Sequence, residues 1–204
     1  MARIAYAHTD VRAQQRLIDS LWDLLETTPF RRITITQLAE AAHCNRATLY
    51  YHNEDANDLL QKALEHELVH EAGVISALAD ELSGKDVSTW SVGASSRLTL
   101  LTRQVDRSLL SEKLQVFSCR LWSLVLCQNG EDLSEEAAQV VAFMIDGMLG
   151  TYAKMQQLGA QECSSSVRDL VLSCAAKLGE LYGVSDSELP SRLRMVERIC
   201  PSLS

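Results

Sequence analysis

Hydrophobic residues recur along most of the chain at spacings of three and four, the period of an amphipathic α-helix. Alternating apolar and polar positions, which indicate strands, are scarce, and only three prolines and nine glycines interrupt the pattern. The pattern therefore predicts an all-α protein. The first helix is predicted from Asp10 to Thr27, and Met1 to Thr9 is expected to be a tail because it shows no periodicity. The inner face of this helix is predicted to hold Leu17, Ile18, Leu21, Trp22, Leu24 and Leu25.

The stretch from Thr34 to His52 is predicted to form two short helices joined by a tight turn. Thr34 and Gln37 have the spacing of a capping box, and Asn45 is a favourable cap for the second helix. The residues predicted to make inward contacts are Leu38, Ala39 and Ala42 in the first helix and Ala47, Leu49 and Tyr50 in the second, with Tyr50 assigned to the core. A unit of this shape can lay its second helix in the major groove of DNA.

The remaining chain is predicted to be a series of further helices. One long helix is expected from Asp55 to about Leu82, followed by a break at Ser83-Gly84-Lys85-Asp86. The helices expected after the break run from Ser88 to Arg107, Leu109 to Lys113, Leu114 to Cys127, Ser134 to Gly159, Ser166 to Tyr182 and Ser187 to Ile199, with a turn at Gln128-Asn129-Gly130. Gly147 and Gly150 lie on the apolar stripe of the helix that follows Ser134, and we expect another backbone to approach them closely.

Charge is distributed unevenly along the 204 residues. Residues 1–52 contain six arginines and five acidic residues (6 − 5 = +1), so the rest of the chain carries −9 of the total net charge of −8. An acidic body with a near-neutral end favours contact with nucleic acid at that end only. The first residues lack a secretory signal and no apolar run is long enough to span a bilayer, so we expect a cytoplasmic protein without a membrane partner.

The six cysteines, at positions 44, 119, 127, 163, 174 and 200, show no Cys-x-x-Cys spacing. We interpret them as reduced, mostly buried thiols and expect neither a metal site nor a cofactor from them.

The segment from Arg12 to Leu60 resembles the N-terminal domain of the tetracycline-repressor (TetR) family of bacterial regulators. The matching stretches are Ile33-Thr34, Leu38-Ala39, Ala42, Thr48-Leu49-Tyr50-Tyr51-His52 and Asp58-Leu59-Leu60. The resemblance implies a helix-turn-helix DNA-binding domain over residues 1–54 and a helical effector-binding and dimerisation domain over residues 55–204. It also implies phosphate contacts by Thr36, Gln37, Thr48, Tyr51 and His52, an approach to base edges by Arg46 and Ala47, and a place for Asn45 in the same DNA-binding set.

Three departures from the family pattern bear on DNA affinity. His43 stands where a turn glycine is usual, so it must adopt a positive φ at some steric cost. Asn53 replaces a common aromatic residue, and Ala56, preceded by the acidic Glu54 and Asp55, replaces a basic residue that grips phosphate in the family. We therefore expect specific binding of modest strength with a shallow salt dependence.

The C-terminal region is where the family encloses an inducer and forms a four-helix dimer interface. The resemblance and the apolar content together predict effector contacts at Trp90, Leu98, Phe117, Leu121, Trp122, Met144, Met148 and Tyr152. The predicted dimer interface consists of Val141, Ile145, Leu149, Val167, Leu170, Val171, Cys174 and Leu178. The alternative in both cases is that these side chains complete the core of a single chain.

His66-Glu67-Leu68-Val69-His70 matches a zinc-protease signature, in which two histidines one turn apart bind zinc and the glutamate activates water. No third ligand follows at a recognisable spacing and strands are scarce, so a solvated helix face is the favoured interpretation and a zinc hydrolase the alternative. The sequence as a whole predicts a homodimeric, non-enzymatic repressor that binds a palindromic double-stranded DNA operator and is released by a small, largely apolar effector. A ligand-binding or protein-binding module with weakened DNA affinity is the second alternative, suggested by Asn53 and Ala56.

Overall fold

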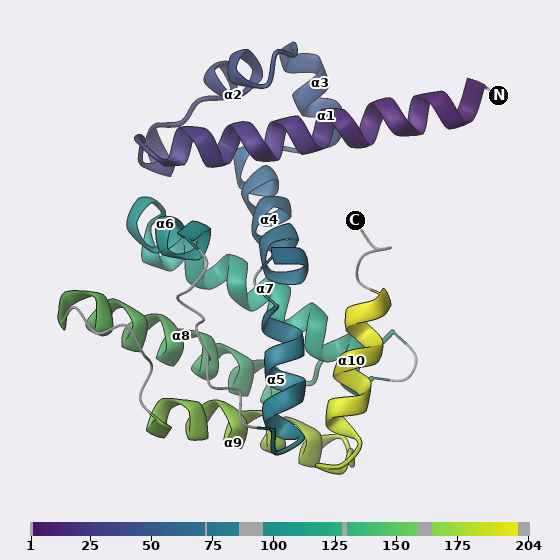
Figure 1. Cartoon of the computed structure of the whole chain (residues 1–204), viewed down its shortest axis with the longest axis vertical. Coiled ribbons are helices and arrows are strands. Elements are labelled where there is room, and N and C mark those ends of the chain that lie inside the picture. The colour runs from purple at the N-terminus through teal and green to yellow at the C-terminus, as the bar shows by residue number, and fades with distance from the viewer. Residues whose placement is uncertain (1, 72, 86–95, 128–129, 159–164, 200–204) are drawn as a thin grey trace.

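The computed structural model describes residues 2–71, 73–85, 96–127, 130–158 and 165–199, and within these ranges it is all-helical (Figure 1). The all-α prediction is therefore confirmed. The elements are α1 (Ala2–Leu25), the 3-10 turn η1 (Phe30–Arg32), α2 (Ile35–Ala41), α3 (Arg46–His52), α4 (Ala56–His66), the π-helical segment η2 (Glu67–Glu71), α5 (Val74–Leu82), α6 (Ser96–Gln104), α7 (Arg107–Leu126), α8 (Glu135–Leu158), α9 (Ser165–Leu181) and α10 (Leu189–Ile199).

Helices α1, α2 and α3, here called the head, form the upper part of the molecule, and α4 descends from them into the body formed by α5 to α10 (Figure 1). The predicted tail is wrong, because α1 begins at Ala2. Alanines at positions 2, 5 and 7 and the absence of glycine and proline favour helix there without any apolar stripe. In the second half of α1, Leu17, Leu21 and Leu25 are fully buried against the rest of the head.

The long helix predicted from Asp55 to Leu82 is interrupted. The α-helical pattern ends at His66, Glu67–Glu71 is wound as a π-helix, and α5 starts only after Gly73, whose φ of +57° is the left-handed conformation that glycine adopts without steric cost. Asp55 is the N-cap of α4 and accepts a hydrogen bond from the backbone N–H of Asp58 (2.8 Å), which lowers the pKa of the Asp55 carboxyl. This cap stabilises the fold above the ordinary pKa of aspartate and is lost as the pH falls below it.

Two further boundaries differ from the sequence prediction. Residues 107 to 126 form a single helix, because the break falls at Asp106, the N-cap of α7, and not at residue 108 or 113. The predicted segment from Ser88 to 95 and the turn residues 128–129 lie outside the described residues, while α6 covers the remainder of the first segment. Gly183, with a φ of +65°, ends α9 as predicted.

Within the part of the chain that the structure describes, the close backbone approach predicted for Gly147 and Gly150 does not occur. A Cβ atom added at Gly147 would meet nothing within 4 Å, and one at Gly150 would meet only the end of the Arg107 side chain at 3.1 Å. Gly147 therefore lies at an open point on the surface of α8.

One apolar core runs without interruption from the head into the body. It passes from Leu17 and Leu21 in α1, through Leu60 and Leu64 in α4, to the helices of the body. The body itself is closed by α10 packing on α5, where Arg194 forms an ion pair with Asp80 at 2.8 Å. Among the described helices, none combines the length and the apolar character that crossing a bilayer requires.

The junction between α3 and α4 is held by a polar cluster centred on Asn53, whose side chain is buried. Its amide exchanges two hydrogen bonds of 3.1 Å with the amide of Gln14 in α1. The ammonium of Lys62 in α4 donates to the carbonyl of His52 at 2.5 Å and also contacts Asn53 and Asp58. Because this cluster joins α1, the end of α3 and α4, it fixes the direction in which α4 leaves the head.

We predict that Asn53→Ala lowers the free energy of unfolding by about 1–3 kcal/mol, because it leaves buried polar groups of Gln14 and Lys62 without their partner. The matched control is Asn57→Ala, an exposed amide four residues further along the chain, which should change the free energy by less than about 0.5 kcal/mol. Urea denaturation followed by circular dichroism measures both. Equal losses in the two variants would contradict the structural role of Asn53.

Candidate nucleic-acid interface and internal cavity

The turn between α2 and α3 has the capped geometry that the sequence predicts. Thr34 and Gln37 form the reciprocal capping box, with the Gln37 N–H donating to Thr34 Oγ1 at 3.3 Å and the Thr34 N–H to Gln37 Oε1 at 2.9 Å. Asn45 accepts a hydrogen bond of 2.7 Å from the Thr48 N–H. His43 has a φ of +50°, so the predicted strain at the glycine-like turn position is present.

Helix α3 turns most of its surface to solvent. Leu49 is completely buried, whereas Arg46 and Ala47 are exposed and Tyr51 is 73% exposed. The assignment of Tyr50 to the core is wrong, since its side chain is 57% exposed. In a helix of seven residues only about one position per turn faces the core, and Leu49 takes that position, so its neighbour points about 100° away.

The side chains of the predicted DNA-binding set come together on the outer faces of α2 and α3. The guanidinium of Arg46 donates to Thr36 Oγ1 across the two helices. Tyr51 and His52 pack edge to face, with ring centroids 5.0 Å apart. The half-buried members of the set are Thr36, Thr48 and His52. The exposed members are Gln37, Asn45, Arg46, Ala47 and Tyr51. This surface, here called the ridge, presents a guanidinium, hydroxyls, a phenol and an imidazole. These groups can donate hydrogen bonds to phosphate oxygens and to acceptors on base edges.

The charges around this ridge are mixed. Exposed arginines at positions 12, 16, 31, 32 and 46 all belong to the head. Glu54 and Asp55 are exposed at the start of α4, and the ammonium of Lys62 bonds to His52 and Asp58. The ridge itself therefore carries the guanidinium of Arg46, while the adjoining α4 terminus is acidic.

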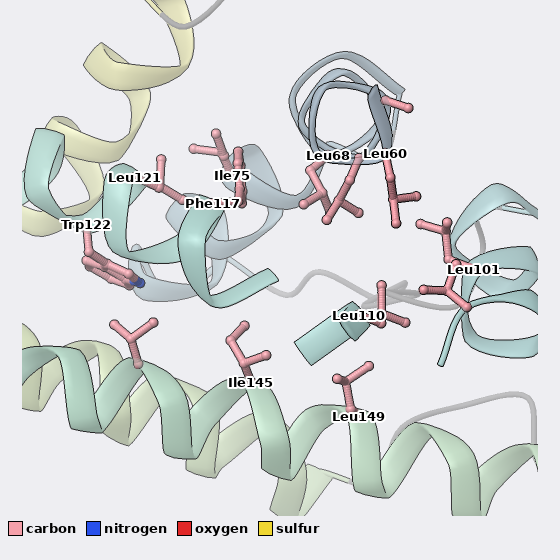
Figure 2. Close-up of a cluster of buried hydrophobic side chains, with 14 of the residues drawn as sticks. Leu60, Leu68, Ile75, Leu101, Leu110, Phe117, Leu121, Trp122, Ile145 and Leu149 are labelled. Atoms are coloured by element: carbon pink, nitrogen blue, oxygen red, sulfur yellow. The ribbon is translucent and has the colours of Figure 1, made fainter. Parts of the chain in front are cut away.

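The body contains a partly open apolar cavity of about 130 Å³. Figure 2 shows buried hydrophobic side chains of this region, and of those it labels, Leu68, Leu101, Phe117 and Ile145 line the cavity. The predicted effector contacts that line the cavity are Leu98, Phe117, Leu121, Trp122, Met144, Met148 and Tyr152. The remaining one, Trp90, lies outside the described residues.

Sequence reasoning missed the contribution of α4, η2 and α5 to this cavity. Leu64, Leu68, Val74 and Leu78 line one side of it. They form the apolar stripe of the segment that was predicted as a connecting helix, and that stripe is the signal that could have assigned them to the cavity.

The lining has few polar groups. Among the described residues that line it, the polar side-chain groups are the hydroxyls of Thr102, Ser118 and Tyr152 and the indole N–H of Trp122. Tyr152 shares a hydrogen bond of 2.6 Å with Thr99, and Thr102 donates to the Thr99 carbonyl at 2.8 Å. The cavity accordingly suits an uncharged, largely apolar molecule.

Arg97 links α6, which lines the cavity, to α1 in the head and to η2. Its guanidinium contacts the carboxylate of Glu67 at 3.3 Å and lies over the ring of Trp22 in α1, 5.2 Å from the ring centroid. Glu67 is only 2% exposed, so its charge depends on partners of this kind. Leu98, the next residue in α6, lines the cavity. A shift of α6 would therefore disturb contacts to the head.

We predict that Arg97→Met lowers the free energy of unfolding by about 1–3 kcal/mol, because it removes a charged partner from a buried carboxylate. Arg103→Met, at an exposed position of the same helix, should cost less than about 0.5 kcal/mol. A double-mutant cycle with Glu67→Gln should give a coupling energy above about 0.5 kcal/mol. Additive effects of the two substitutions would show that the pair does not interact as described.

The zinc-signature residues span the transition from α4 to η2. Glu67, the residue that the alternative requires as a base, is buried and paired with Arg97. Within the part of the chain that the structure describes, no three His, Cys, Asp or Glu side chains come together as a metal site. The side chain of His70 is outside that part.

The predicted dimer contacts divide into two groups. Val141, Ile145, Leu149, Val171 and Leu178 are buried within the chain itself, so they form core and cannot meet a second copy. Leu170 is 58% exposed, and Val167 and Cys174 are half-buried. The apolar residue that the prediction missed is Phe143, which is 69% exposed. A shallow groove on the outer face of α8 and α9 is lined by Glu136, Gln139, Val140, Phe143, Leu170, Ser173, Cys174 and Lys177.

The described cysteines are free thiols, but they are only half-buried, whereas mostly buried thiols were predicted. Partial burial raises the pKa of Cys44, Cys119, Cys127 and Cys174. They are therefore protonated near neutral pH and lack the thiolate character of a nucleophile or metal ligand. Cys163 and Cys200 lie outside the described residues.

No protein-family model matches this chain, and no curated protein shows significant similarity to it. Its function must therefore be argued from the geometry of the ridge, the cavity and the outer face of α8 and α9.

Proposed function

We propose that the protein is a DNA-binding transcription regulator of the TetR type, acting as a homodimer whose affinity for an operator depends on a small molecule bound in the body. The observation that carries the proposal is the capped α2–α3 pair, which exposes Arg46, Ala47 and Tyr51 in one ridge while Leu49 anchors α3. The apolar cavity below it supplies a second binding site, separate from the ridge.

In this proposal α3 enters the major groove and α2 crosses the backbone. Arg46 reads a base edge, preferably guanine, through its planar pair of donors, while Thr36, Thr48 and Tyr51 donate to phosphates. In the free protein the guanidinium of Arg46 donates to Thr36, which holds it on the outer face of the ridge. The acidic start of α4 repels phosphate and limits the number of cationic contacts.

Arg97 provides a physical route from the cavity to the head. Leu98, Leu101 and Thr102 of α6 line the cavity, and Arg97 of the same helix contacts Trp22 and Glu67. A ligand that binds better when α6 is displaced would change the orientation of the two heads, and that difference in affinity between the two states is what coupling requires. Repression with release by the ligand is the proposed mode.

The outer face of α8 and α9 is the proposed surface for the second copy. Phe143 and Leu170 are large exposed apolar residues on adjoining helices, and Gly147 leaves room for close approach from outside. Two such helices from each copy would form a four-helix contact about a two-fold axis. The axis would place the heads on successive major grooves, roughly 34–36 Å apart.

We predict that Arg46→Ala raises the Kd for an operator fragment about 10- to 100-fold, because a bidentate base contact contributes about 1–3 kcal/mol. Arg198→Ala, at an exposed position of α10, is the control and should leave the Kd unchanged. Fluorescence anisotropy with duplexes from the region upstream of the protein's own coding sequence measures the affinities. For the unaltered protein, log affinity should fall with log salt with a slope shallower than about −8. A steeper slope would contradict the small number of phosphate contacts.

We predict that Phe143→Asp converts the dimer to a monomer at micromolar concentration, because it places a charge in the centre of an apolar contact. Met195→Asp introduces the same charge at another exposed apolar position, on α10, and should leave the dimer intact. Sedimentation velocity distinguishes the species. A stable monomer of the unaltered protein would contradict the proposed interface.

A ligand-binding or protein-binding module without DNA affinity is the second candidate. It is favoured by the exposed acidic residues Glu54 and Asp55 beside the ridge and by Ala56 where a phosphate-gripping base is expected. The anisotropy measurement decides between the two, since this module would bind every duplex weakly and equally.

A further inference from the structure

The size of the cavity limits the ligand to a small molecule. Its volume of about 130 Å³ is slightly below that of an engineered apolar cavity of about 150 Å³ that stays dry and binds benzene. A single aromatic ring therefore fills most of this volume, whereas a long acyl chain, with more than twice as many heavy atoms, would extend beyond it. This comparison concerns the cavity alone and needs no assumption about DNA.

The chemistry of the lining limits the ligand further. Among the described residues that line the cavity, none carries a formal charge, so a carboxylate or ammonium would lose its hydration without a counter-ion. Phe117, Trp122 and Tyr152 contribute three aromatic rings, and the thioethers of Met144 and Met148 make favourable contacts with ring edges. These groups favour an aromatic ring over an aliphatic one.

One position in the lining can satisfy a hydroxyl group. Tyr152 Oη lies 2.6 Å from Thr99 Oγ1, and only one of the two hydroxyl protons can occupy that bond. Whichever group donates, the Tyr152 oxygen retains hydrogen-bonding capacity, as an acceptor when it donates to Thr99 and as a donor when it accepts. Thr102 and Ser118 add hydroxyl oxygens to the same lining.

We infer that the cavity binds an uncharged compound with a single aromatic ring and one hydroxyl group, with the ring among Phe117, Trp122 and Met148 and the hydroxyl at Tyr152. The inference rests on the proposed function for its regulatory meaning, because such a compound would be the effector that releases the operator. Binding itself is measured without DNA.

The experiment is isothermal calorimetry and thermal unfolding of the full chain with four probes: toluene, phenol, benzoate and dodecanoate. Toluene and phenol are expected to bind saturably and to raise Tm, since a ligand of the folded state stabilises it. Benzoate, which adds a charge, and dodecanoate, which adds length, are expected to give no saturable shift. Tighter binding of either anion than of phenol would overturn the assigned ligand class.

The hydroxyl contact is tested by the ratio of the toluene Kd to the phenol Kd. Tyr152→Phe is expected to lower this ratio up to about tenfold by weakening phenol alone, because it removes one hydrogen bond. Tyr182→Phe is the matched control, since the Tyr182 hydroxyl accepts from the Ser134 N–H outside the cavity, and it should leave the ratio unchanged. An unchanged ratio in Tyr152→Phe would overturn the placement of the hydroxyl.

Met148→Phe adds bulk to the cavity and is expected to abolish the toluene shift while the variant stays folded by circular dichroism. Failure of both toluene and phenol to bind the unaltered chain would overturn the inference, even if the protein binds its operator. Binding of phenol by a protein that shows no DNA preference would overturn the proposed function and support the cavity assignment.

Discussion

A helix as short as α3 cannot hold its own position, and the proposed DNA contact depends on what holds it. Isolated helices of seven residues are unstable in water, so α3 persists through its tertiary anchors. Those anchors are the Asn45 cap at its start, the buried Leu49 in its middle and the cluster of Asn53, Gln14 and Lys62 at its end. Because all inward positions are used for anchoring, the remaining side chains point outward and form the ridge.

The continuous core and the contacts of Arg97 connect the two proposed sites. The core is continuous from α1 to the body, so the head has no separate apolar interior. A polar junction accompanies this core near the cavity. There the buried carboxylate of Glu67 pairs with Arg97, and the Arg97 guanidinium lies over the ring of Trp22. An ion pair at such a point has strict geometric demands, since its energy falls quickly when a buried charge loses its partner. A small displacement of α6 therefore has a large effect on the contacts of α1.

Local signals in the sequence were sufficient for the parts of the fold that depend on neighbouring residues. The capping box of Thr34 and Gln37, the Asn45 cap and the positive φ at His43 follow from short-range chemistry, and all three are present. Most of the residues that line the cavity were also predictable, because a segment with apolar residues on more than one side is buried among neighbouring helices. Whether they bind an effector stays a prediction.

Signals that depend on the tertiary arrangement were not readable. The helix is interrupted after His66 by a π-helical segment, which the spacing of hydrophobic residues does not predict. Tyr50 is large and aromatic, like many core residues, but Leu49 occupies the position of α3 that faces the core. On α8 and α9 the richest apolar stripe was assigned to a partner, whereas the chain buries it and exposes Phe143 instead. Which of two apolar faces packs internally is decided by the neighbouring helices.

The most direct test of the central claim is selection of binding sites from random-sequence duplex DNA by the purified protein. The account predicts enrichment of a palindromic sequence whose half-sites lie about one helical turn apart, since two copies of α3 would read successive major grooves. Recovery of sequences with no common motif would contradict it and would show that the exposed ridge of α3 has another use.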